Sequence, residues 1–460
     1  MGEKLLSKKF GEVEILVAVG FLARKSGVRR SLSIIAVGVA AVLTVGACSS
    51  TGQDVVVTEF QTAGANAAPA PSQVTVPPTQ SVAVSSAPAA SAAAPAAAKV
   101  NIISLPAFGS TDLAPATPIT VTVFNADITG MTVTGSDGSA LKGDISADGA
   151  TFTLSQGMKY GQTYNFVGVA KGTDGTETPI TGTMATVAPT DTNRAAITPS
   201  QGETVGVAAP IVIQFYGQVK DRAAAQRALT VTAVDKSGAP LNVEGSWGWL
   251  QDEEIKTAGV LQSQVHFRPK DFWPAYTTVT VKANLYGVNL GGTWGREDVS
   301  QTFTIGRDLR VDANVSSFRM KVTVDGAQVQ DFPVSYGKTE DVRRATRNGI
   351  HIVQEKFPDY DMCNTQFNYC GVKVKWAVRI NNNGEFIHEN DSTIPQQGVA
   401  NVSHGCVNMS TANAKIFYDM ALYGDPVTVS NSPGAPDLGP ADYNYDWSYT
   451  YDQWKKFSAL

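Results

Sequence analysis

Short segments in which apolar and polar residues alternate recur between residues 100 and 306. Four of these segments form two similar pairs, 118–124 with 131–134 and 210–215 with 229–232. A turn that contains glycine follows each pair, at 137–138 and at 236–238. Alternating runs of this length, separated by turn residues, are typical of strands with one buried face. We therefore predict two related β-sandwiches of immunoglobulin type, over residues 100–190 and 191–306.

The region after residue 306 also begins with a strand pattern. Residues 320–324 alternate apolar and polar side chains and lead into Asp325-Gly326, a two-residue signal for a β-hairpin. Residues 424–429 combine a Gly-Asp-Pro turn with a further alternating run, which predicts a closing strand. We expect residues 307–430 to form a third, mostly β domain.

One helix is predicted in this third domain, directly after Met409. Its apolar stripe at helical spacing is Ala412, Ile416 and Phe417. Ser410 or Thr411 can cap its first turn through a side-chain hydroxyl.

The N-terminus has the composition of a secretory signal. Arg29-Arg30 precede an uncharged, mainly apolar run over 31–45, and small residues then lead into Cys48. These small residues resemble a lipobox, so we expect residues 1–47 to be a lipoprotein signal peptide, with lipid attached to Cys48. The mature protein would be extracytoplasmic and anchored to the cell membrane. The alternative is an ordinary signal anchor with an incidental cysteine.

Residues 48–99 are predicted to be a disordered tether. No charged residue occurs from Gln61 to Ala98, where Ala, Pro, Ser and Val dominate, and this composition cannot bury a core. Such a tether would span roughly 40 Å as a coil and up to about 140 Å as an extended polyproline-like chain. It would carry the folded domains well away from the membrane.

Length and charge agree with this division. The chain has 460 residues and a formal net charge of -5, which is too long for one domain and too acidic overall to suggest nucleic-acid binding. Cysteine is rare, with four residues in the whole chain.

Cys406, in the string Ser-His-Gly-Cys-Val-Asn over 403–408, is the candidate nucleophile. A thiol reacts as its thiolate, and near neutrality a free thiol with a pKa of about 8.5 is mostly protonated. A nearby imidazole can take the proton and hold the resulting ion pair, and both His388 and His404 qualify as that base. On an extended strand, His404 and Cys406 would share one face. The amides of Gly405 and Cys406 are candidate donors to an oxyanion.

The alternative interpretation is that Cys406 and the histidines are buried core residues. The complete pattern of His388 followed by the string 403–408 is more specific, and it resembles the active-site signature of the L,D-transpeptidases that cross-link bacterial peptidoglycan. Residues 335–338 and 347–350 look like further segments of that family. Residues 446–454 resemble the aromatic C-terminal extension of its mycobacterial-type members.

This resemblance implies a mainly β fold, with two immunoglobulin-like β-sandwiches followed by a β-rich L,D-transpeptidase catalytic domain that contains one or two helices. The catalytic domain would cover residues 307–430, and the aromatic extension residues 431–460.

The resemblance also implies a mechanism. Cys406 would attack the bond after the third residue of a donor tetrapeptide stem, release the terminal D-alanine and form a thioester. A side-chain amine on the third residue of a neighbouring stem would then take the acyl group, which gives a three-to-three cross-link. The implied partners are peptidoglycan stem peptides, with β-lactams of carbapenem type as covalent inhibitors and no metal or organic cofactor.

Within this mechanism His388 would act as the base, with its other ring nitrogen oriented by the backbone carbonyl of Glu389. His404 would shape the pocket beside the nucleophile, and the amides of Gly405 and Cys406 would bind the oxyanion. The residues expected to contact substrate are Met362, Tyr369, Glu389, Ser403 and Asn408.

Two features depart from the family pattern. Glu389 stands where members of this type often have serine. Residues 362–371 occupy the position of the lid over the catalytic cleft, but this lid is shorter than usual. Cys370 falls where a lid tyrosine is expected, and Tyr369 is the substitute.

Cys363 and Cys370 admit two interpretations. Together with His388, His404 and Cys406 they resemble a set of metal ligands, but the tight Cys-x-x-Cys and His-x-x-x-His spacings of zinc sites are missing. In an oxidising compartment a disulfide between Cys363 and Cys370 is the preferred interpretation. It would clamp the lid and stabilise the fold by roughly 2.5 kcal/mol.

Three functions stay open on the sequence alone. The first is the transpeptidase, the second is an L,D-carboxypeptidase in which water replaces the acceptor amine, and the third is a non-catalytic wall-binding lipoprotein. Glycan stacking is an alternative role for aromatic residues of the second sandwich, although core packing is preferred for most of them. These residues are Trp247, Trp249, Phe272 and Trp273.

Overall fold

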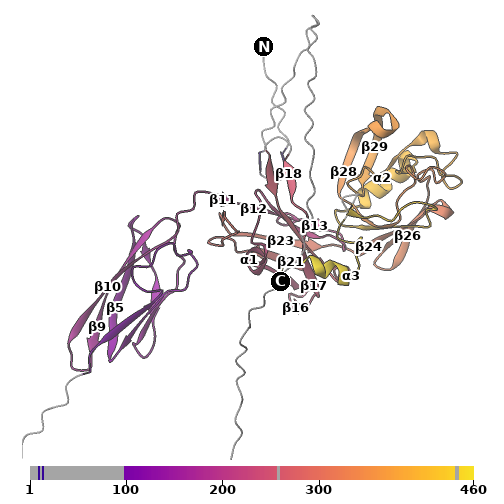
Figure 1. Ribbon diagram of the computed structural model, residues 1–460. Coiled ribbons are helices and arrows are strands. Elements are labelled where there is room, and N and C mark those ends of the chain that lie inside the picture. Colours follow the sequence, from indigo (N-terminus) through magenta and orange to yellow (C-terminus); the bar gives the residue numbers. More distant parts are fainter. Residues whose placement is uncertain (1–8, 11–12, 15–97, 256–258, 441–444) are drawn as a thin grey trace, which may run out of the picture. The chain divides into compact units, whose positions relative to one another are not determined.

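The computed structural model of the chain describes residues 9–10, 13–14, 98–255, 259–440 and 445–460 (Figure 1). The predicted mainly β fold is confirmed. The predicted signal peptide, Cys48 and the tether lie outside the described residues, apart from the short strands β1 (Lys9–Phe10) and β2 (Val13–Glu14) and residues 98–99. No helix in the described ranges has both the length and the apolar character needed to cross a membrane.

The first β-sandwich is built from eight strands in two sheets of four. The sheets have the orders β3-β4-β8-β7 and β10-β9-β5-β6. The strands are β3 (Asn101–Leu105), β4 (Thr120–Phe124), β5 (Ala126–Gly135), β6 (Ala140–Leu141), β7 (Gly143–Ile145), β8 (Thr151–Leu154), β9 (Thr163–Gly172) and β10 (Glu177–Ala185). Alternation in β4 buries Val121 and Val123 between the sheets, against Tyr164 and Phe166 of β9.

The second β-sandwich has sheets with the orders β12-β14-β20-β17 and β13-β23-β21-β15-β16. Its main elements are β12 (Ala195–Thr198), β13 (Thr204–Val205), β14 (Ile211–Phe215), α1 (Arg222–Arg227), β15 (Leu229–Val234), β16 (Pro240–Leu241), β17 (Gly245–Trp249), β20 (Gln264–Pro269), β21 (Thr278–Ala283) and β23 (Val299–Ile305). Two small pairs complete it, β11 (Thr192–Asn193) with β22 (Trp294–Gly295) and β18 (Glu253–Ile255) with β19 (Val260–Gln262).

The two sandwiches share one topology. When β13 is set aside, the strands of the second sandwich follow the same spatial order as those of the first. The paired sequence segments occupy equivalent strands, β4 with β14 and β5 with β15. Their turns are equivalent as well, because Gly138 and Gly238 adopt φ values of 80° and 86° between the last two strands of corresponding sheets. The predicted relationship between the two units is therefore confirmed.

The tryptophans of the second sandwich belong to its core. Trp247, Trp249 and Trp273 are all buried, and the indole N–H of Trp273 donates to the carbonyl of Ala209 at 2.9 Å. Phe272 is half-buried against Trp447, with ring centroids 4.7 Å apart. The preferred interpretation of core packing is correct for the three tryptophans, which leaves their rings no face for glycan stacking.

The third domain consists of two sheets, with the orders β26-β25-β24-β32-β27 and β28-β29-β30-β31. Its strands are β24 (Leu309–Asn314), β25 (Arg319–Val324), β26 (Ala327–Pro333), β27 (Gly349–Ile352), β28 (Glu355–Asn364), β29 (Tyr369–Arg379), β30 (Phe386–Glu389), β31 (Val407–Met409) and β32 (Pro426–Ser430). Short 3-10 turns are η1 (Val315–Ser317), η2 (Thr365–Phe367) and η3 (Asp391–Thr393). Both the predicted hairpin and the closing strand are present.

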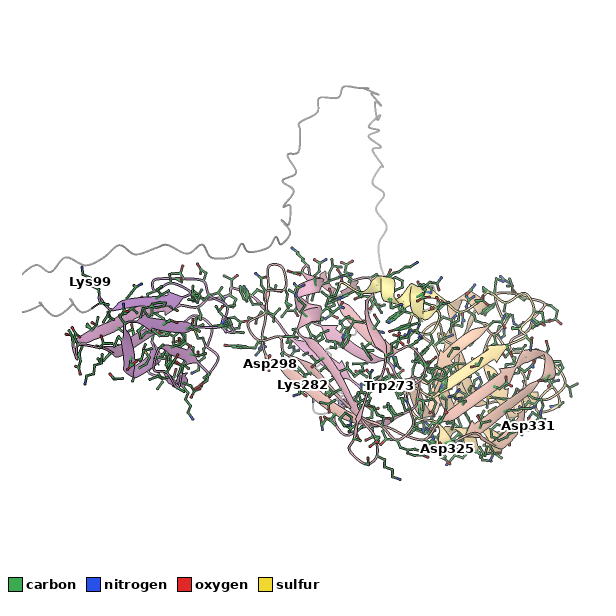
Figure 2. The ribbon with its side chains drawn as sticks, turned by 90° about the horizontal axis from the view of Figure 1, so that it is seen from below. Lys99, Trp273, Lys282, Asp298, Asp325 and Asp331 are labelled. Carbon is green, nitrogen blue, oxygen red and sulfur yellow. A yellow bond between two sulfur atoms is a disulfide. The ribbon has the colours of Figure 1, made fainter. Side chains whose placement is uncertain are left out.

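The turn of the β25–β26 hairpin has the backbone conformation that an Asp-Gly pair favours. Asp325 and Gly326 have φ values of 50° and 83°, the left-handed pair that a two-residue turn requires. Asp325 marks this turn in Figure 2, and Asp331 lies farther along β26.

The predicted helix is α2 (Thr411–Met420), which packs beside β29 (Figure 1). Ser410 caps it by accepting a hydrogen bond from the Asn413 amide. The predicted apolar stripe was wrong in part. Ala412 is exposed and Ile416 is 40% exposed, whereas the buried face carries Ala414 and Phe417. The helix turns the face with Ala414 and Phe417 toward β29 and β30, and this packing leaves Ile416 on the outer side.

The aromatic C-terminal segment contains α3 (Tyr451–Trp454) and η5 (Lys455–Phe457), and it returns to the second sandwich. The indole N–H of Trp447 donates to the Ala208 carbonyl at 2.8 Å, and that of Trp454 donates to the Ser246 carbonyl at 2.9 Å. Trp454 is fully buried. The segment is therefore part of the packed structure.

Candidate active site

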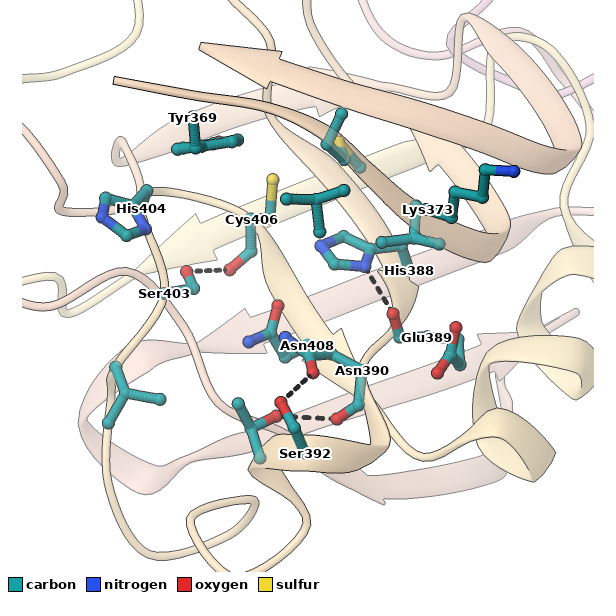
Figure 3. Close-up of a pocket in the computed structure, with 15 residues that line it drawn as sticks. Tyr369, Lys373, His388, Glu389, Asn390, Ser392, Ser403, His404, Cys406 and Asn408 are labelled. Atoms are coloured by element: carbon teal, nitrogen blue, oxygen red, sulfur yellow. Dashed lines mark hydrogen bonds between the residues drawn. The ribbon is translucent and has the colours of Figure 1, made fainter. Parts of the chain in front are cut away.

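A cavity of about 430 Å³ lies where the lid hairpin of β28 and β29 faces the strand ends of β30 and β31 (Figure 3). The predicted site residues that line it are Met362, Tyr369, His388, Glu389, Ser403, His404, Cys406 and Asn408. The strands β30 and β31 are parallel neighbours, and His388 pairs with Asn408. His388 and the string 403–408, which lie apart in the sequence, therefore meet at one edge of the sheet.

His388 is buried and its ring is held in one orientation. Its Nδ1 donates to the backbone carbonyl of Glu389 at 2.7 Å, as expected (Figure 3). A carbonyl only accepts, so the neutral ring carries its proton on Nδ1 and leaves a lone pair on Nε2. Burial lowers the pKa of His388 below its ordinary value, against smaller opposing effects of the Glu389 carbonyl and carboxylate. The imidazole is therefore a neutral base at rest.

Cys406 is a free, buried thiol whose surroundings disfavour the thiolate. Burial raises the pKa of the Cys406 thiol to about 12, a backbone hydrogen bond from Phe386 lowers it, and the charge of Glu385 raises it further. The sulfur also lies 3.8 Å from the Gly384 carbonyl, which accepts from an S–H. Since both partners are buried, two neutral groups are favoured over the predicted ion pair.

The segment before Cys406 is a tight bend and not the extended strand that would put His404 and Cys406 on one face. Gly405 has a φ of 120°, which favours glycine. The Ser403 hydroxyl donates to the Cys406 carbonyl at 2.5 Å and accepts from the Gly405 amide at 3.2 Å. The Gly405 amide, expected at the oxyanion, is thus engaged by a side chain, and the Cys406 amide is the other candidate donor.

His404 lies on the exposed side of this bend, against the tip of the lid. Its ring centroid is 4.9 Å from that of Phe367 and 5.5 Å from that of Tyr369. Tyr369 lies close to Cys406 as well, because burial raises the pKa of the phenol and a thiolate at Cys406 would raise it further. His404 therefore connects the bend to the lid.

The lid hairpin carries a disulfide between Cys363 and Cys370 near its tip. These two sulfurs are therefore not available as the metal ligands of the alternative interpretation. Met362, next to the disulfide, packs with Cys406, Phe386 and Val374 in one apolar cluster. The lid thus forms the roof over the thiol.

Two regions of the chain match known families. Residues 110–289 match the family model described as a bacterial Ig domain, and residues 308–429 match that of the L,D-transpeptidase catalytic domain. L,D-transpeptidase 5 of Mycobacterium tuberculosis (strain ATCC 25618 / H37Rv) is 42% identical over 356 residues, 77% of this chain and 76% of that protein. The chain belongs to the L,D-transpeptidase family.

Two further relatives are similar to this L,D-transpeptidase. L,D-transpeptidase 2 of Mycobacterium tuberculosis (strain CDC 1551 / Oshkosh) is 32% identical over 355 residues, which cover 74% of this chain and 81% of that protein. A solved structure of an L,D-transpeptidase from Mycobacterium smegmatis is 29% identical, with a TM-score of 0.40. The match covers 52% of this chain and 99% of that chain.

Two side chains that sequence reasoning missed, Thr346 and Arg344, form hydrogen bonds with the backbone at this bend. The hydroxyl of fully buried Thr346 donates to the Gly405 carbonyl at 2.8 Å and accepts from the Gly337 amide at 2.9 Å. Arg344 donates to the carbonyls of Val402 and Ser403, at 2.6 and 3.2 Å. Arg344 lies in a basic run with Arg343 and Arg347, which ordinarily marks a solvated face, and nothing in the local sequence marks Thr346.

Lys373 was missed as well, although it lines the cavity from the lid strand β29. Its signal was weak, because a lysine in an alternating strand ordinarily marks a solvated face. Lys373 is exposed and alternates in β29 with Val374, which packs in the apolar cluster with Cys406.

Proposed function

We propose that this protein is a peptidoglycan L,D-transpeptidase in which Cys406 is the nucleophile and His388 the base, and which forms three-to-three cross-links between stem peptides. The observation that carries the proposal is one cavity lined by both a buried thiol and a neutral imidazole whose Nε2 lone pair is unoccupied. This arrangement suits proton transfer during attack.

In the acylation step, the Cys406 sulfur attacks the carbonyl carbon after the third residue of the donor stem, and the S–H proton moves to Nε2 of His388. The carbonyl oxygen becomes an oxyanion that the Cys406 amide can stabilise. When the C–N bond breaks, His388 returns the proton to the departing D-alanine amine. The product is a thioester on Cys406.

In the second step, His388 takes a proton from the acceptor amine as it attacks the thioester. The C–S bond breaks, and the released thiolate regains the proton from the imidazolium, which restores two neutral groups. Water in place of the amine would make the same site an L,D-carboxypeptidase. A carbapenem presents a strained amide to the same sulfur, so we propose carbapenem-type β-lactams as acylating inhibitors.

Incubation of the purified protein with tetrapeptide muropeptides tests this proposal. Cross-linked dimers with free D-alanine support transfer, whereas tripeptide monomers alone indicate hydrolysis. A mass shift of one carbapenem on the native protein, absent from a folded Cys406→Ala variant, supports the nucleophile. Retained activity in Cys406→Ala would refute it, and an inert native protein that binds cell wall would favour the non-catalytic lipoprotein.

We further propose that the protein is lipid-anchored through Cys48 on the outer face of the cell membrane. The support is the basic, apolar and small-residue order before Cys48. Labelling with a tritiated fatty acid, in cells that express the native chain or Cys48→Ala, tests this. Equal labelling and equal membrane association of both chains would refute the anchor.

A further inference from the structure

Glu385 is a buried acid behind the bend at residues 403–406, and the mechanism above does not use it. The residue is 5% exposed. A side-chain carbon at Gly405 would lie 3.5 Å from Cγ of Glu385 and 3.6 Å from its Oε1, so the carboxylate lies against the bend that carries Cys406. A buried charge is costly unless hydrogen bonds compensate it, and the partners of Glu385 therefore indicate its role.

One carboxylate oxygen of Glu385 holds the segment that supports the bend. It accepts a hydrogen bond from the Arg347 amide at 3.0 Å. The preceding residue is Thr346, whose hydroxyl donates to the Gly405 carbonyl at 2.8 Å. The position of the Arg347 amide therefore helps to fix the hydroxyl that holds the bend.

The other carboxylate oxygen holds the turn 381–385. Oδ1 of Asn381 accepts from two backbone amides of this turn, at 3.0 and 3.2 Å. These donors set the orientation of the amide group, so Nδ2 of Asn381 donates to the Glu385 carboxylate. The Gly384 carbonyl of the same turn lies 3.8 Å from the Cys406 sulfur. Glu385 thus connects the turn that contacts the sulfur with the segment that supports the bend.

His351 is fully buried beside this carboxylate and is neutral. Its Nε2 donates to the Arg347 carbonyl at 3.0 Å, and its Nδ1 lies 3.4 Å from Nδ2 of Asn381. An amide nitrogen only donates, so Nδ1 accepts and the ring carries one proton, on Nε2. His351 therefore fixes the Arg347 carbonyl and adds no positive charge beside Glu385.

The negative charge of Glu385 acts on the Cys406 thiol. Hydrogen bonds from two amides favour the ionised carboxylate. Burial raises the pKa of Cys406 to about 12, and the Glu385 charge contributes to this rise against the opposing hydrogen bond from Phe386. A neutral thiol reacts slowly unless the electrophile lies where His388 can take the proton. The charge therefore favours electrophiles that fit the cavity.

We propose that Glu385 is a positioning residue that fixes the backbone around Cys406 and keeps its sulfur a neutral thiol until an acyl donor is bound beside His388. This inference rests on the proposed function, because it assumes that Cys406 is the nucleophile. Position and charge are two separable contributions of the one carboxylate.

Two substitutions separate the charge from the position. Glu385→Gln removes the charge but keeps an oxygen for the Arg347 amide, whereas Glu385→Asp keeps the charge and withdraws the carboxylate by one methylene. The full-length protein is treated with iodoacetamide at pH 8, and mass mapping follows the peptide that contains Cys406. Glu385→Gln should be alkylated about fivefold faster, since no carboxylate then opposes the thiolate. Glu385→Asp should stay within about twofold of the native rate.

Carbapenem acylation reports the position of the sulfur. Glu385→Asp should be acylated about tenfold more slowly, because both segments around Cys406 lose a contact, and Glu385→Gln should stay within about threefold of the native rate. Glu385→Met supplies a second neutral variant of similar length, which should also be alkylated faster. Glu340→Gln is the control for both assays, because Glu340 is exposed and outside the lining of the catalytic cavity.

Alkylation of a folded neutral variant at or below the native rate would overturn the role of the charge. A native rate of carbapenem acylation in Glu385→Asp would overturn the positioning role. Failure of the native protein to form an acyl-enzyme would instead overturn the proposed function, and the alkylation rates would still decide whether the Glu385 charge acts on the thiol.

Discussion

The substitution Thr346→Val tests whether the Thr346 hydroxyl stabilises the bend at residues 403–406. In Thr346→Val a methyl group replaces the hydroxyl at nearly the same volume, and the Gly337 amide and the Gly405 carbonyl lose their partner in a buried position. A buried polar group left without its partner costs about 1–3 kcal/mol. We expect the two together to destabilise the catalytic domain by about 3 kcal/mol.

Calorimetry measures this loss. For a domain of this size, about 3 kcal/mol lowers the melting temperature of the catalytic transition by roughly 10 °C. The bend also carries the proposed nucleophile Cys406, so the rate of carbapenem acylation should fall about tenfold when the sulfur is less well positioned.

Two variants serve as controls for this experiment. Thr346→Ser keeps the hydroxyl and should keep most of the stability and the rate. Thr232→Val makes the same exchange at an exposed strand position, where changes are usually within about 0.5 kcal/mol. If Thr346→Val melts within about 2 °C of the native protein and acylates normally, the bend does not depend on this hydroxyl.

Three further predictions concern the thiol, the base and the lid. Because the pKa of Cys406 is raised to about 12, alkylation of Cys406 by iodoacetamide should accelerate about tenfold per pH unit from pH 7 to 10, and a plateau near pH 7 would reveal a resting thiolate instead. Burial lowers the pKa of His388, so carbapenem acylation should persist below pH 6.5. The acylation rate should decline only as pH falls through the lowered pKa, where the imidazole becomes protonated. A midpoint of this decline at or above pH 6.5 would contradict the prediction. The double variant Cys363→Ser with Cys370→Ser should speed amide exchange in the lid and cost up to about 2.5 kcal/mol of stability. Unchanged exchange would argue against a clamp, as would peptide mapping that finds Cys406 bridged to either cysteine.

Local patterns predicted the elements well where a short stretch of chain decides its own conformation. The alternation in β4 and β14 follows from the two faces of a strand, and the Asp325-Gly326 turn follows from the φ values that a two-residue hairpin requires. The helix α2 was predicted with its Ser410 cap for the same reason. Its buried face was not, because the sheet that packs against it selects the face.

The site shows the same division between local and long-range information. Residue order around His388 and Cys406 was sufficient to predict the family, which the comparisons confirm, since the string 403–408 is short, specific and contiguous. The catalytic pair itself stays a prediction. Only the tertiary structure revealed the bend in place of a strand and the support by Thr346. These contacts join residues far apart in the chain.

The protonation state of the site also depends on the folded chain. Sequence alone determined which groups can exchange a proton, because that is a property of thiol and imidazole chemistry. Whether they rest as ions or as neutral groups is decided by burial, which disfavours charge on both Cys406 and His388. Burial is a property of the packed domain, set by a lid, a sheet edge and a bend that meet only after folding.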